Sequence, residues 1–249
     1  MTQLKALIFD VDGTLAETER NGHRLAFNRA FAEANLSWNW SETLYGELLE
    51  VSGGKERIRH YIQLYYPNFK EDLETLIPQL HQAKTRHYRQ LLLSGEIQLR
   101  LGIKRLIEEA DSQGIRLAIA TTSALPNVFA LLEKHLNPDW FEIIAAGDIV
   151  PHKKPAPDIY KYVLNKMNLE ADECLVFEDS FHGLQAAYEA NLKTVITLHD
   201  YTKNQDFSYA SLVLNHLGEP EKCFTIIKGD VQHKDYFDVE LAKTLINKE

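Results

Sequence analysis

Four short runs of apolar residues constrain the fold of this 249-residue chain more than any other feature. Each run is too short for a helix and apolar almost throughout, which is typical of a strand covered on both faces of a parallel sheet. Amphipathic segments separate the runs, and strands that alternate with helices predict an open parallel α/β sheet. The runs lie at residues 5–9, 115–120, 174–177 and 194–198.

Amphipathic spacing predicts three helices among these strands. One of them ends at a glycine and another starts with a proline, which are the residues favoured at those positions of a helix. The tail beyond about residue 217 has the weakest pattern, with a strand expected at 225–228 and a helix at 239–248. The three helices are predicted at residues 103–114, 126–136 and 181–192.

Residues 16–95 differ from the rest because they contain no strand-like apolar run. We therefore expect an all-helical cap domain at residues 16–95, inserted into a Rossmann-like α/β core formed by residues 1–15 and 96–249. Two chain crossings between the domains would let the cap hinge over the edge of the sheet. The cap helices are expected at about 19–34, 41–50, 54–66 and 69–93.

The composition excludes several classes of protein. The chain is 45% apolar and 25% charged, as ordinary globular enzymes are. A net charge of −9 argues against nucleic-acid binding, which needs a basic face. The two cysteines form no CxxC motif, so we expect no disulfide framework. We see no signal peptide and no run of the roughly 18 apolar residues that span a membrane, so we expect a monomer in the cytoplasm, or in a plastid if a transit peptide has been removed.

Polar residues suited to phosphoryl transfer follow the predicted strands. The chain reads DVDGT from Asp10, TTS from Thr121, KKP from Lys153 and EDS from Glu178. Ligands of open parallel sheets bind beyond the carboxyl ends of the strands, so these segments should meet at one edge. Together they supply carboxylates, hydroxyls and an ammonium group.

Asp10 is the candidate nucleophile, because a carboxylate can attack phosphorus and divide one difficult displacement into two easier ones. Asp12 is the candidate general acid and base, which would protonate the leaving oxygen and later accept a proton from water. An acid working near neutral pH needs a raised pKa, and cap closure with nearby carboxylates could supply one. The alternative, that both are ordinary turn residues, stays open.

A dianionic phosphate cannot lie among carboxylates without a compensating cation. Mg²⁺ suits an all-oxygen site, and we expect the Asp10 carboxylate, the Asp12 main-chain carbonyl and Asp179 as its ligands. Glu178 is expected to join directly or through water. Helix N-capping is the alternative role for Glu178 and Asp179.

The remaining core residues are expected to bind the phosphoryl group. Thr121 should donate a hydrogen bond to it, with the main-chain N–H of Thr122 and the neighbouring Ser123 assisting. Lys154 should neutralise its charge, with Lys153 as the competing lysine. A simple cluster of hydroxyl residues at a helix start is the alternative for the Thr121 segment.

The ordered phrases FDVDGTL, KKPAPDIY and FEDSFHG resemble the haloacid-dehalogenase superfamily over nearly the whole chain. A helical insertion after the first phrase is similar to the β-phosphoglucomutase-like branch. The stretches LAETERNGHRLAFN, SGGKERI, AKTRHY and TTSALPN resemble its CbbY-type subgroup. The resemblance implies a sugar-bisphosphate phosphatase with xylulose 1,5-bisphosphate as the favoured substrate, and its KP pattern favours Lys154 over Lys153. An extra residue near Asn21 and Gly22 departs from some members.

A bisphosphate needs a second anion site away from the metal. Arg57 and Lys55 are the first candidates because they lie beside a flexible glycine pair, and arginine makes bidentate phosphate contacts. Sugar hydroxyls or a proton in transit could engage Glu17 and His23, whereas the other nine histidines show no metal-ligand spacing. A solvated helix face is the alternative for each cap residue. The candidates are Glu17, His23, Gly54, Lys55, Arg57 and Lys84.

Three other functions compete with a phosphatase. A phosphosugar mutase would use the same motifs but pass the phosphoryl group to a second hydroxyl instead of water. A non-catalytic metabolite-binding module would have lost a nucleophile or a ligand, and none is lost. A 2-haloacid dehalogenase would need neither Asp12 as an acid nor the carboxylates of Glu178 and Asp179. We therefore predict a Mg²⁺-dependent phosphatase acting on a small phosphorylated sugar.

Overall fold

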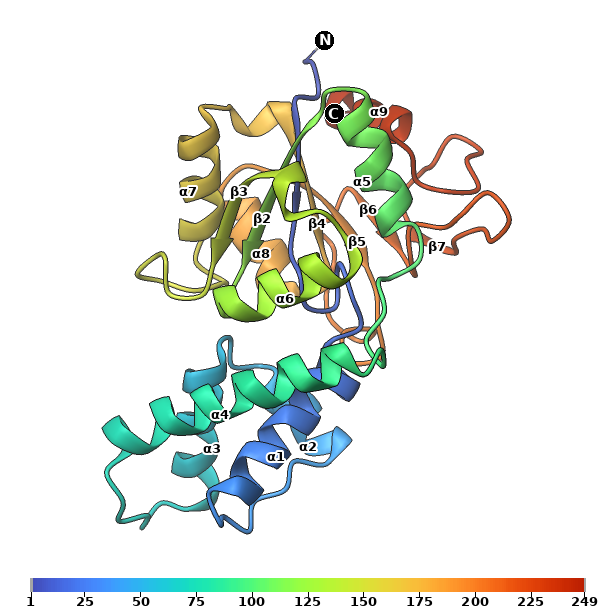
Figure 1. Cartoon of the computed structure of the whole chain (residues 1–249). Helices are drawn as coiled ribbons and strands as arrows, with labels where there is room; N and C mark the ends of the chain where they lie inside the picture. Colours follow the sequence, from blue (N-terminus) through green and yellow to red (C-terminus); the bar gives the residue numbers. More distant parts are fainter. Residues whose placement is uncertain (1, 249) are drawn as a thin grey trace.

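A seven-stranded sheet forms the larger of two bodies in the computed structural model, which describes residues 2–248 (Figure 1). The strand order is β3-β2-β1-β4-β5-β6-β7, with β7 antiparallel to β6 and all other neighbours parallel. The predicted open α/β sheet is confirmed. The strands are β1 (Ala6–Phe9), β2 (Arg116–Thr121), β3 (Phe141–Ala146), β4 (Cys174–Glu178), β5 (Lys193–Thr197), β6 (Leu212–Leu214) and β7 (Ile226–Lys228).

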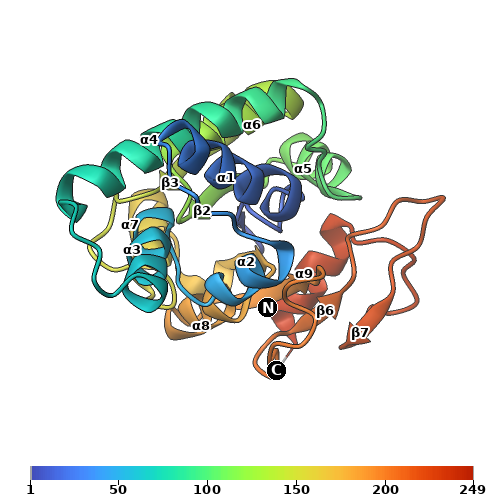
Figure 2. The same ribbon diagram turned by 90° about the horizontal axis from the view of Figure 1, so that it is seen from below.

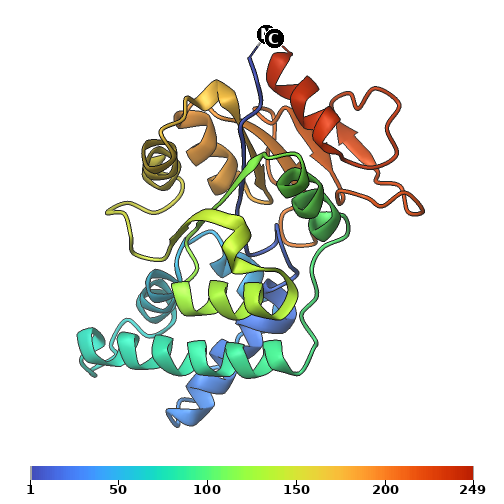
Figure 3. The same ribbon diagram turned by 45° about the horizontal axis from the view of Figure 1, so that its top comes forward.

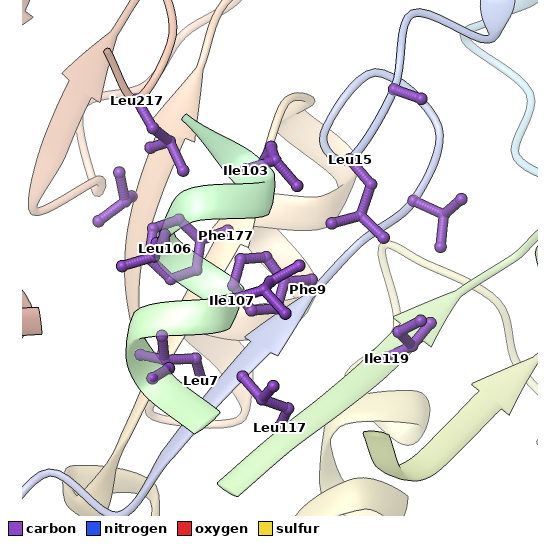
Figure 4. Packing of buried hydrophobic residues seen from close by; sticks show 14 of the residues in the cluster. Leu7, Phe9, Leu15, Ile103, Leu106, Ile107, Leu117, Ile119, Phe177 and Leu217 are labelled. Atoms are coloured by element: carbon purple, nitrogen blue, oxygen red, sulfur yellow. The ribbon is translucent and has the colours of Figure 1, made fainter. Parts of the chain in front are cut away.

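β1 lies in the middle of the sheet between β2 and β4, and both of its faces are buried. Leu7 and Phe9 belong to the apolar cluster on one face, and Ala6 and Ile8 belong to the cluster on the other. Figure 4 shows Leu7 and Phe9 packed under the helix α5 (Ile103–Ser112). Each Å² of apolar surface buried in this way stabilises the fold by about 25 cal/mol, which explains why the run is apolar throughout.

Helices cover both faces of the sheet. The Leu7 face carries α5, α6 (Leu125–His135) and α9 (Val239–Asn247), and the opposite face carries α7 (Asp158–Met167) and α8 (Phe181–Glu189). The three helices predicted among the strands are confirmed as α5, α6 and α8. The strand and the helix predicted in the tail are confirmed as β7 and α9.

Two strands escaped the sequence prediction. β3 contains the exposed Glu142, which interrupts the apolar run that would have marked it. β6 is only three residues long and was not distinguished from the irregular segments around it, although the equally short β7 was expected. β3 matters for the site, because the chain leaves its carboxyl end and turns back through Lys153 and Lys154 before α7.

The described part of the second body is helical and faces the carboxyl ends of the strands (Figure 1). Viewed from below, its helices lie in front of the sheet (Figure 2). The four predicted helical segments are found, although the first consists of a π-helical turn followed by an α-helix. The elements are η1 (Glu19–His23), α1 (Arg24–Glu33), α2 (Glu42–Leu48), α3 (Gly54–Tyr65) and α4 (Leu73–Leu93).

The π-helical turn η1 contains the extra residue noted near Asn21 and Gly22. A π-helical turn closes its hydrogen bond one residue later than an α-helix, so it absorbs one additional residue without ending the helix. Gly22 fits there because a Cβ atom at this position would lie 2.9 Å from the side chain of Ile97. The insertion therefore leaves His23 at the start of α1.

The helical body has its own apolar core, which is rich in aromatic rings. The ring of Trp40 lies at the centre, with centroids 4.6 Å from Phe27, 4.9 Å from Phe31 and 5.3 Å from Tyr61. Trp38 packs edge-on against Phe31 at 5.3 Å. Such edge-to-face pairs add to the stabilisation from burial alone. The helical body therefore has an apolar cluster of its own, separate from those on the two faces of the sheet.

Two chain segments join the bodies and run side by side. The main-chain N–H of Arg100 donates to the carbonyl of Leu15 at 2.8 Å, and Ala16 and Leu99 form an antiparallel bridge. The segments that lead to the two ends of the chain lie side by side at the far end of the core body (Figure 3), where the Asn247 side chain donates to the carbonyl of Thr2 at 3.0 Å. The domain boundaries near residues 16 and 95 stay a prediction. Across residues 2–248, no helix has both the length and the apolar character needed to cross a membrane.

Candidate active site

Three buried carboxylates meet at the carboxyl edge of the sheet. Asp10 follows β1, and Glu178 and Asp179 end and follow β4. β1 and β4 are parallel neighbours with Phe9 opposite Phe177, so the two strands end side by side. Each carboxylate offers an oxygen atom within 4.8 Å of the other two. The sheet register thus gathers carboxylates that are far apart in the chain.

Lys154 enters this cluster from the turn before α7. Its Nζ atom lies 2.7 Å from Asp10 Oδ1 and 2.5 Å from Glu178 Oε1, and it also donates to the carbonyl of Ala120 at 2.8 Å. Burial alone would lower the pKa of Lys154, but the attraction of both carboxylates outweighs burial and raises that pKa. Lys153 points elsewhere and pairs with cap and loop carboxylates.

The cluster carries more negative than positive charge. Burial raises the pKa of Asp10 well above its ordinary value, against the opposing attraction of Lys154. Burial also raises the pKa of Asp179 to about 6, although a hydrogen bond from His199 opposes the rise. Three carboxylates share one buried ammonium group, and their donor atoms are all oxygen. This donor set fits Mg²⁺, which prefers oxygen ligands and would restore the charge balance.

Asp12 lies beside the cluster and accepts three hydrogen bonds. Its Oδ1 atom accepts from the Thr18 hydroxyl at 2.5 Å and from His23 Nε2 at 2.7 Å, and Oδ2 accepts from the Ser123 hydroxyl. Although burial acts to raise the pKa of Asp12, the His23 ring and the hydroxyl donors lower it below its ordinary value. The raised pKa expected from the sequence is therefore wrong for this arrangement, because these donors stabilise the ionised form.

His23 connects Asp12 to a buried lysine. The Nζ atom of Lys84 lies 2.9 Å from His23 Nδ1, and burial lowers the pKa of Lys84 to about 8. A lysine ammonium group can only donate, so His23 Nδ1 accepts and His23 Nε2 carries the proton that faces Asp12. Lys84, His23 and Asp12 thus form a continuous chain from α4 to the first strand.

Two adjoining cavities lie between the bodies. The first, of about 90 Å³, is lined by Asp10 and Asp179 of the carboxylate cluster and by Thr121 and Thr122. The second, of about 40 Å³, is lined by cap residues and by Ser123. Both cavities share Asp12, Glu19, Gly53, Arg57 and Thr122. One ligand could therefore reach from the carboxylate cluster into the cap.

The structure brings only some of the predicted cap residues to these cavities. The second cavity is lined by His23, Gly54, Arg57 and Lys84. The guanidinium group of Arg57 also holds the preceding loop, because it donates to the carbonyls of Leu48 at 3.1 Å and Val51 at 3.2 Å.

Two predicted residues lie away from both cavities. Glu17 pairs with Arg100 at 2.9 Å beside the chain crossings. Lys55 pairs with Asp148 at 2.6 Å and lines a separate cavity between the bodies. Of the six cap residues predicted from the sequence, Glu17 and Lys55 therefore do not line either of the two adjoining cavities.

Sequence reasoning missed three residues that hold the cluster in place. The Tyr160 hydroxyl donates to Glu178 Oε1 at 2.6 Å, and His199 Nε2 lies 2.6 Å from Asp179 Oδ2. Arg100 donates to the carbonyl of Gly13 at 2.7 Å. Tyr160 is part of the recognised KKPAPDIY phrase, so its signal was present. Arg100 lies in the stretch GEIQLRLGI, which also resembles the CbbY-type subgroup, but it was not singled out there. His199 stands in no motif, and the partners of both residues became visible only through the fold.

Comparisons with known proteins show the family that the chain is similar to. Residues 4–191 match the family model described as haloacid dehalogenase-like hydrolase. The chain is 47% identical over 222 residues to the plasmid protein CbbY of Cupriavidus necator, covering 87% of each. Crystal structures of CbbY from Rhodobacter sphaeroides are similar, one with phosphate (TM-score 0.79, 44% identity) and a mutant with xylulose-(1,5)bisphosphate (TM-score 0.80, 42% identity). Both comparisons cover 86% of this chain and 95% of the other.

Proposed function

Because this chain belongs to the haloacid dehalogenase-like hydrolases and is a phosphatase of that family, we propose that its substrate is a small sugar bisphosphate, with xylulose 1,5-bisphosphate favoured. The observation that carries this proposal is the pair of connected cavities. One contains the carboxylates and Lys154, and the other presents the cations of Arg57 and Lys84. A sugar with a phosphate at each end would satisfy both.

The first chemical step would belong to Asp10. Its carboxylate attacks phosphorus, a bond forms between them, and the bond from phosphorus to the sugar oxygen breaks. Lys154, 2.7 Å from Asp10, favours the ionised form of this carboxylate against its burial and also faces the transferring group. Thr121 and the main-chain N–H of Thr122 border the same cavity and would bind the phosphoryl oxygens.

Asp12 would move the proton in both steps. It gives a proton to the departing sugar oxygen, then takes one from the water that attacks the aspartyl phosphate and frees Asp10. Asp12 must hold a proton before the first step, whereas His23 and the hydroxyl donors favour its ionised form in this arrangement. His23 lies between Asp12 and Lys84, so it is placed to pass a proton along that chain.

Mg²⁺ is the proposed cofactor. The carboxylates of Asp10, Glu178 and Asp179 and the main-chain carbonyl of Asp12 are the groups that would hold it. When bound, the ion would offset the charge of the phosphate and of the surrounding carboxylates. Protein treated with a chelator should lose activity, and added Mg²⁺ should restore it. Ca²⁺ should restore little, because its looser coordination would misplace Asp10.

The second phosphate would bind in the cap cavity. Arg57 and Lys84 supply its positive charge, and Gly54 starts the helix α3 beside them. Binding there would favour the closed arrangement of the two bodies and hold the reacting phosphorus against Asp10. In this proposal residues 16–95 act as the cap, and the remote phosphate provides the energy that closes it.

The proposal is tested by measuring released phosphate with Mg²⁺ present. Xylulose 1,5-bisphosphate should be hydrolysed to a monophosphate with a higher kcat/KM than either of its monophosphates or p-nitrophenyl phosphate. The same assay, followed by mass spectrometry and chromatography of the sugar, separates the alternatives. An isomeric sugar phosphate without free phosphate would indicate a mutase. Equal efficiency on bisphosphates and monophosphates would leave a broad sugar phosphatase.

A further inference from the structure

The loop at residues 198–205, between β5 and β6, brings a histidine to the carboxylate cluster. His199 Nε2 lies 2.6 Å from Asp179 Oδ2, and the two side chains are only 5% and 8% exposed. We propose that His199 is a positioning residue that fixes the orientation of Asp179 and thereby makes the site selective for Mg²⁺ over larger cations. This inference rests on the proposed role of Asp179 as a metal ligand.

The hydrogen bonds of the His199 ring define its role. The other ring nitrogen, Nδ1, accepts the main-chain N–H of Tyr201 at 3.4 Å. Nε2 therefore carries the proton and donates it to Asp179 Oδ2. The Thr14 hydroxyl donates to the second oxygen, Asp179 Oδ1, at 3.5 Å. One carboxylate is thus oriented by donors from two separate segments.

Gly13 gives this pair the space it needs. A Cβ atom at Gly13 would lie 2.8 Å from His199 Nε2 and would also collide with the Asp179 carboxylate. Gly13 has a φ of +84°, which side-chain-bearing residues rarely adopt. The DVDGT turn therefore packs its glycine directly against the Asp179–His199 pair, and a side chain at this position would displace both groups.

The loop that carries His199 is fixed at both ends of the site. The ring of Tyr201 packs edge-on against Tyr45 of the helical body, with centroids 6.0 Å apart. It also covers Gly46, where a Cβ atom would lie 3.0 Å from the Tyr201 ring. Gln205 accepts the N–H of Phe181 at the start of α8, at 2.8 Å. The loop that carries His199 is therefore tied to the core body through Gln205 and, in this arrangement of the two bodies, to the helical body through Tyr201.

A fixed carboxylate should discriminate between cations. Mg²⁺ requires near-ideal octahedral geometry at short distances, whereas Ca²⁺ accepts more ligands in a flexible arrangement at longer distances. Hydrogen-bond partners that orient metal ligands commonly alter metal affinity by about 10-fold to 100-fold. Releasing Asp179 should therefore weaken Mg²⁺ binding more than Ca²⁺ binding. A residue that only supported the fold would alter both affinities together.

The test is calorimetric titration of chelator-treated protein with Mg²⁺ and with Ca²⁺, which requires no turnover. His199→Leu fills the space of the ring without a donor, and we expect it to weaken Mg²⁺ binding by about 10-fold or more and Ca²⁺ binding by less. His199→Gln keeps an N–H donor and should recover part of the Mg²⁺ affinity. His182→Ala is the matched control, because His182 lines the same cavity without a hydrogen bond to the described cluster, and its Mg²⁺ affinity should stay unchanged.

Two outcomes would overturn the proposal. The first is an unchanged ratio of Mg²⁺ to Ca²⁺ affinity in His199→Leu, and the second is a Mg²⁺ affinity of His199→Gln no higher than that of His199→Leu. If His199→Leu does not fold, the ratio of Mg²⁺ to Ca²⁺ affinity in His199→Gln decides. This ratio should still be lower than in wild type, because the glutamine amide places its N–H donor differently from the histidine ring. A third measurement tests the proposed metal site separately from the role of His199. Asp179→Asn should lose most Mg²⁺ affinity in parallel. If it does not, the proposed metal site fails instead.

Discussion

The active site has two walls that are built on different principles. The core wall consists of the residues at the strand ends, with Asp10, Lys154 and Asp179, and the cap wall consists of the cap residues that line the cavities, with Arg57 and Lys84. The core wall gathers side chains from strand ends that are distant in the chain, and its charges pair across those elements, as Lys154 does with Asp10 and Glu178. In the cap wall, Arg57 donates to the carbonyls of Leu48 and Val51 in the preceding loop, and Lys84 pairs with His23 within the same helical body. The sheet register therefore fixes the chemistry, whereas the helical body carries the recognition groups as a unit.

The packing beneath the walls follows the same division. Aliphatic residues dominate the core on both faces of β1, whereas aromatic rings around Trp40 form the centre of the helical body. The helical body thus has an aromatic cluster of its own, while its inner face, with Tyr88 and Leu91, packs into the cluster of the sheet. The covalent link between the bodies consists of two paired crossings at Ala16 and Leu99. A body with its own core can move as a rigid unit, which is what closure over a substrate requires.

The largest expected effect comes from breaking the core wall at Asp10. Asp10→Asn keeps the shape of the side chain but removes its nucleophilic carboxylate, so phosphate release should fall by about 10³-fold or more. The melting temperature should not fall, because burial already raises the pKa of Asp10 and makes its ionised form costly in the cluster. Steady-state phosphate release and thermal unfolding measure the two effects.

Two checks protect this result. Mass spectrometry after the assay must show that the introduced asparagine has not deamidated back to aspartate, since a trace of wild-type chain would mimic slow turnover. Circular dichroism must show a wild-type fold. Substantial turnover by a correctly folded and undeamidated variant would exclude Asp10 as the nucleophile.

The core wall was largely predictable because its motifs stand at strand ends. A run that can only be a buried strand, followed by DVDGT, places Asp10 at the edge of the sheet before any coordinates are known. The approach of Lys154 to Asp10 followed from the KP pattern of the resembling family. The physical reason is that backbone geometry alone orients these side chains, so spacing along the chain carries the information.

The rest of the site depends on contacts that spacing does not encode. His199 reaches Asp179 from a loop without a motif, and Asp12 has a lowered pKa because His23 arrives from the helical body. Lys55 and Arg57 looked equivalent in the sequence, but two residues along α3 turn them to different cavities. Such outcomes depend on how the two bodies dock, and a single sequence contains no periodic signal for docking.

The second prediction sharpens the contrast between Lys84 and Lys55 of the cap. Lys84→Met keeps the apolar stem of the side chain and removes its charge. It should lower kcat/KM on xylulose 1,5-bisphosphate by about 10-fold to 100-fold, as expected for a lost charged hydrogen bond of about 1.5–3 kcal/mol. Hydrolysis of p-nitrophenyl phosphate should fall less, because that compound does not reach the second cavity and loses only what Lys84 contributes to Asp12 through His23.

Lys55→Met is the matched control, since Lys55 pairs with Asp148 and lines a different cavity. In this variant, the ratio of kcat/KM on xylulose 1,5-bisphosphate to kcat/KM on p-nitrophenyl phosphate should stay within about threefold of the wild-type ratio, because an exposed ion pair contributes little energy. Equal losses in both variants would show that the second phosphate lies between the cavities. A loss in Lys55→Met alone would move the second phosphate to the Lys55 cavity.

The smallest effect concerns an ion-pair network that ties the two walls together. Asp148, in the loop after β3, lies 2.6 Å from Lys55 of the helical body and 3.0 Å from Lys153 of the core. Lys153 also reaches Glu56 of the helical body at 2.8 Å. The hydrogen bonds from Lys55 and Lys153 lower the pKa of Asp148 to about 2. Like the packing of Tyr201 against Tyr45, this network connects the core body to the helical body, but it does so through charged groups.

Asp148→Asn should lower the free energy of unfolding by less than about 1 kcal/mol at neutral pH, because the Asp148 carboxylate is half-exposed and screened by solvent. A depressed pKa contributes stability above the ordinary value of 3.8, and that stability is lost as the pH falls towards 2. Denaturant titrations should therefore show a smaller difference in the free energy of unfolding between wild type and Asp148→Asn at pH 3 than at pH 7. Adding 1 M salt at pH 7 should reduce this difference too. Asp111→Asn, an exposed change on α5, should show neither trend. If the difference in the free energy of unfolding depends on neither pH nor salt, then Asp148 stabilises the loop by its shape and not by its charge.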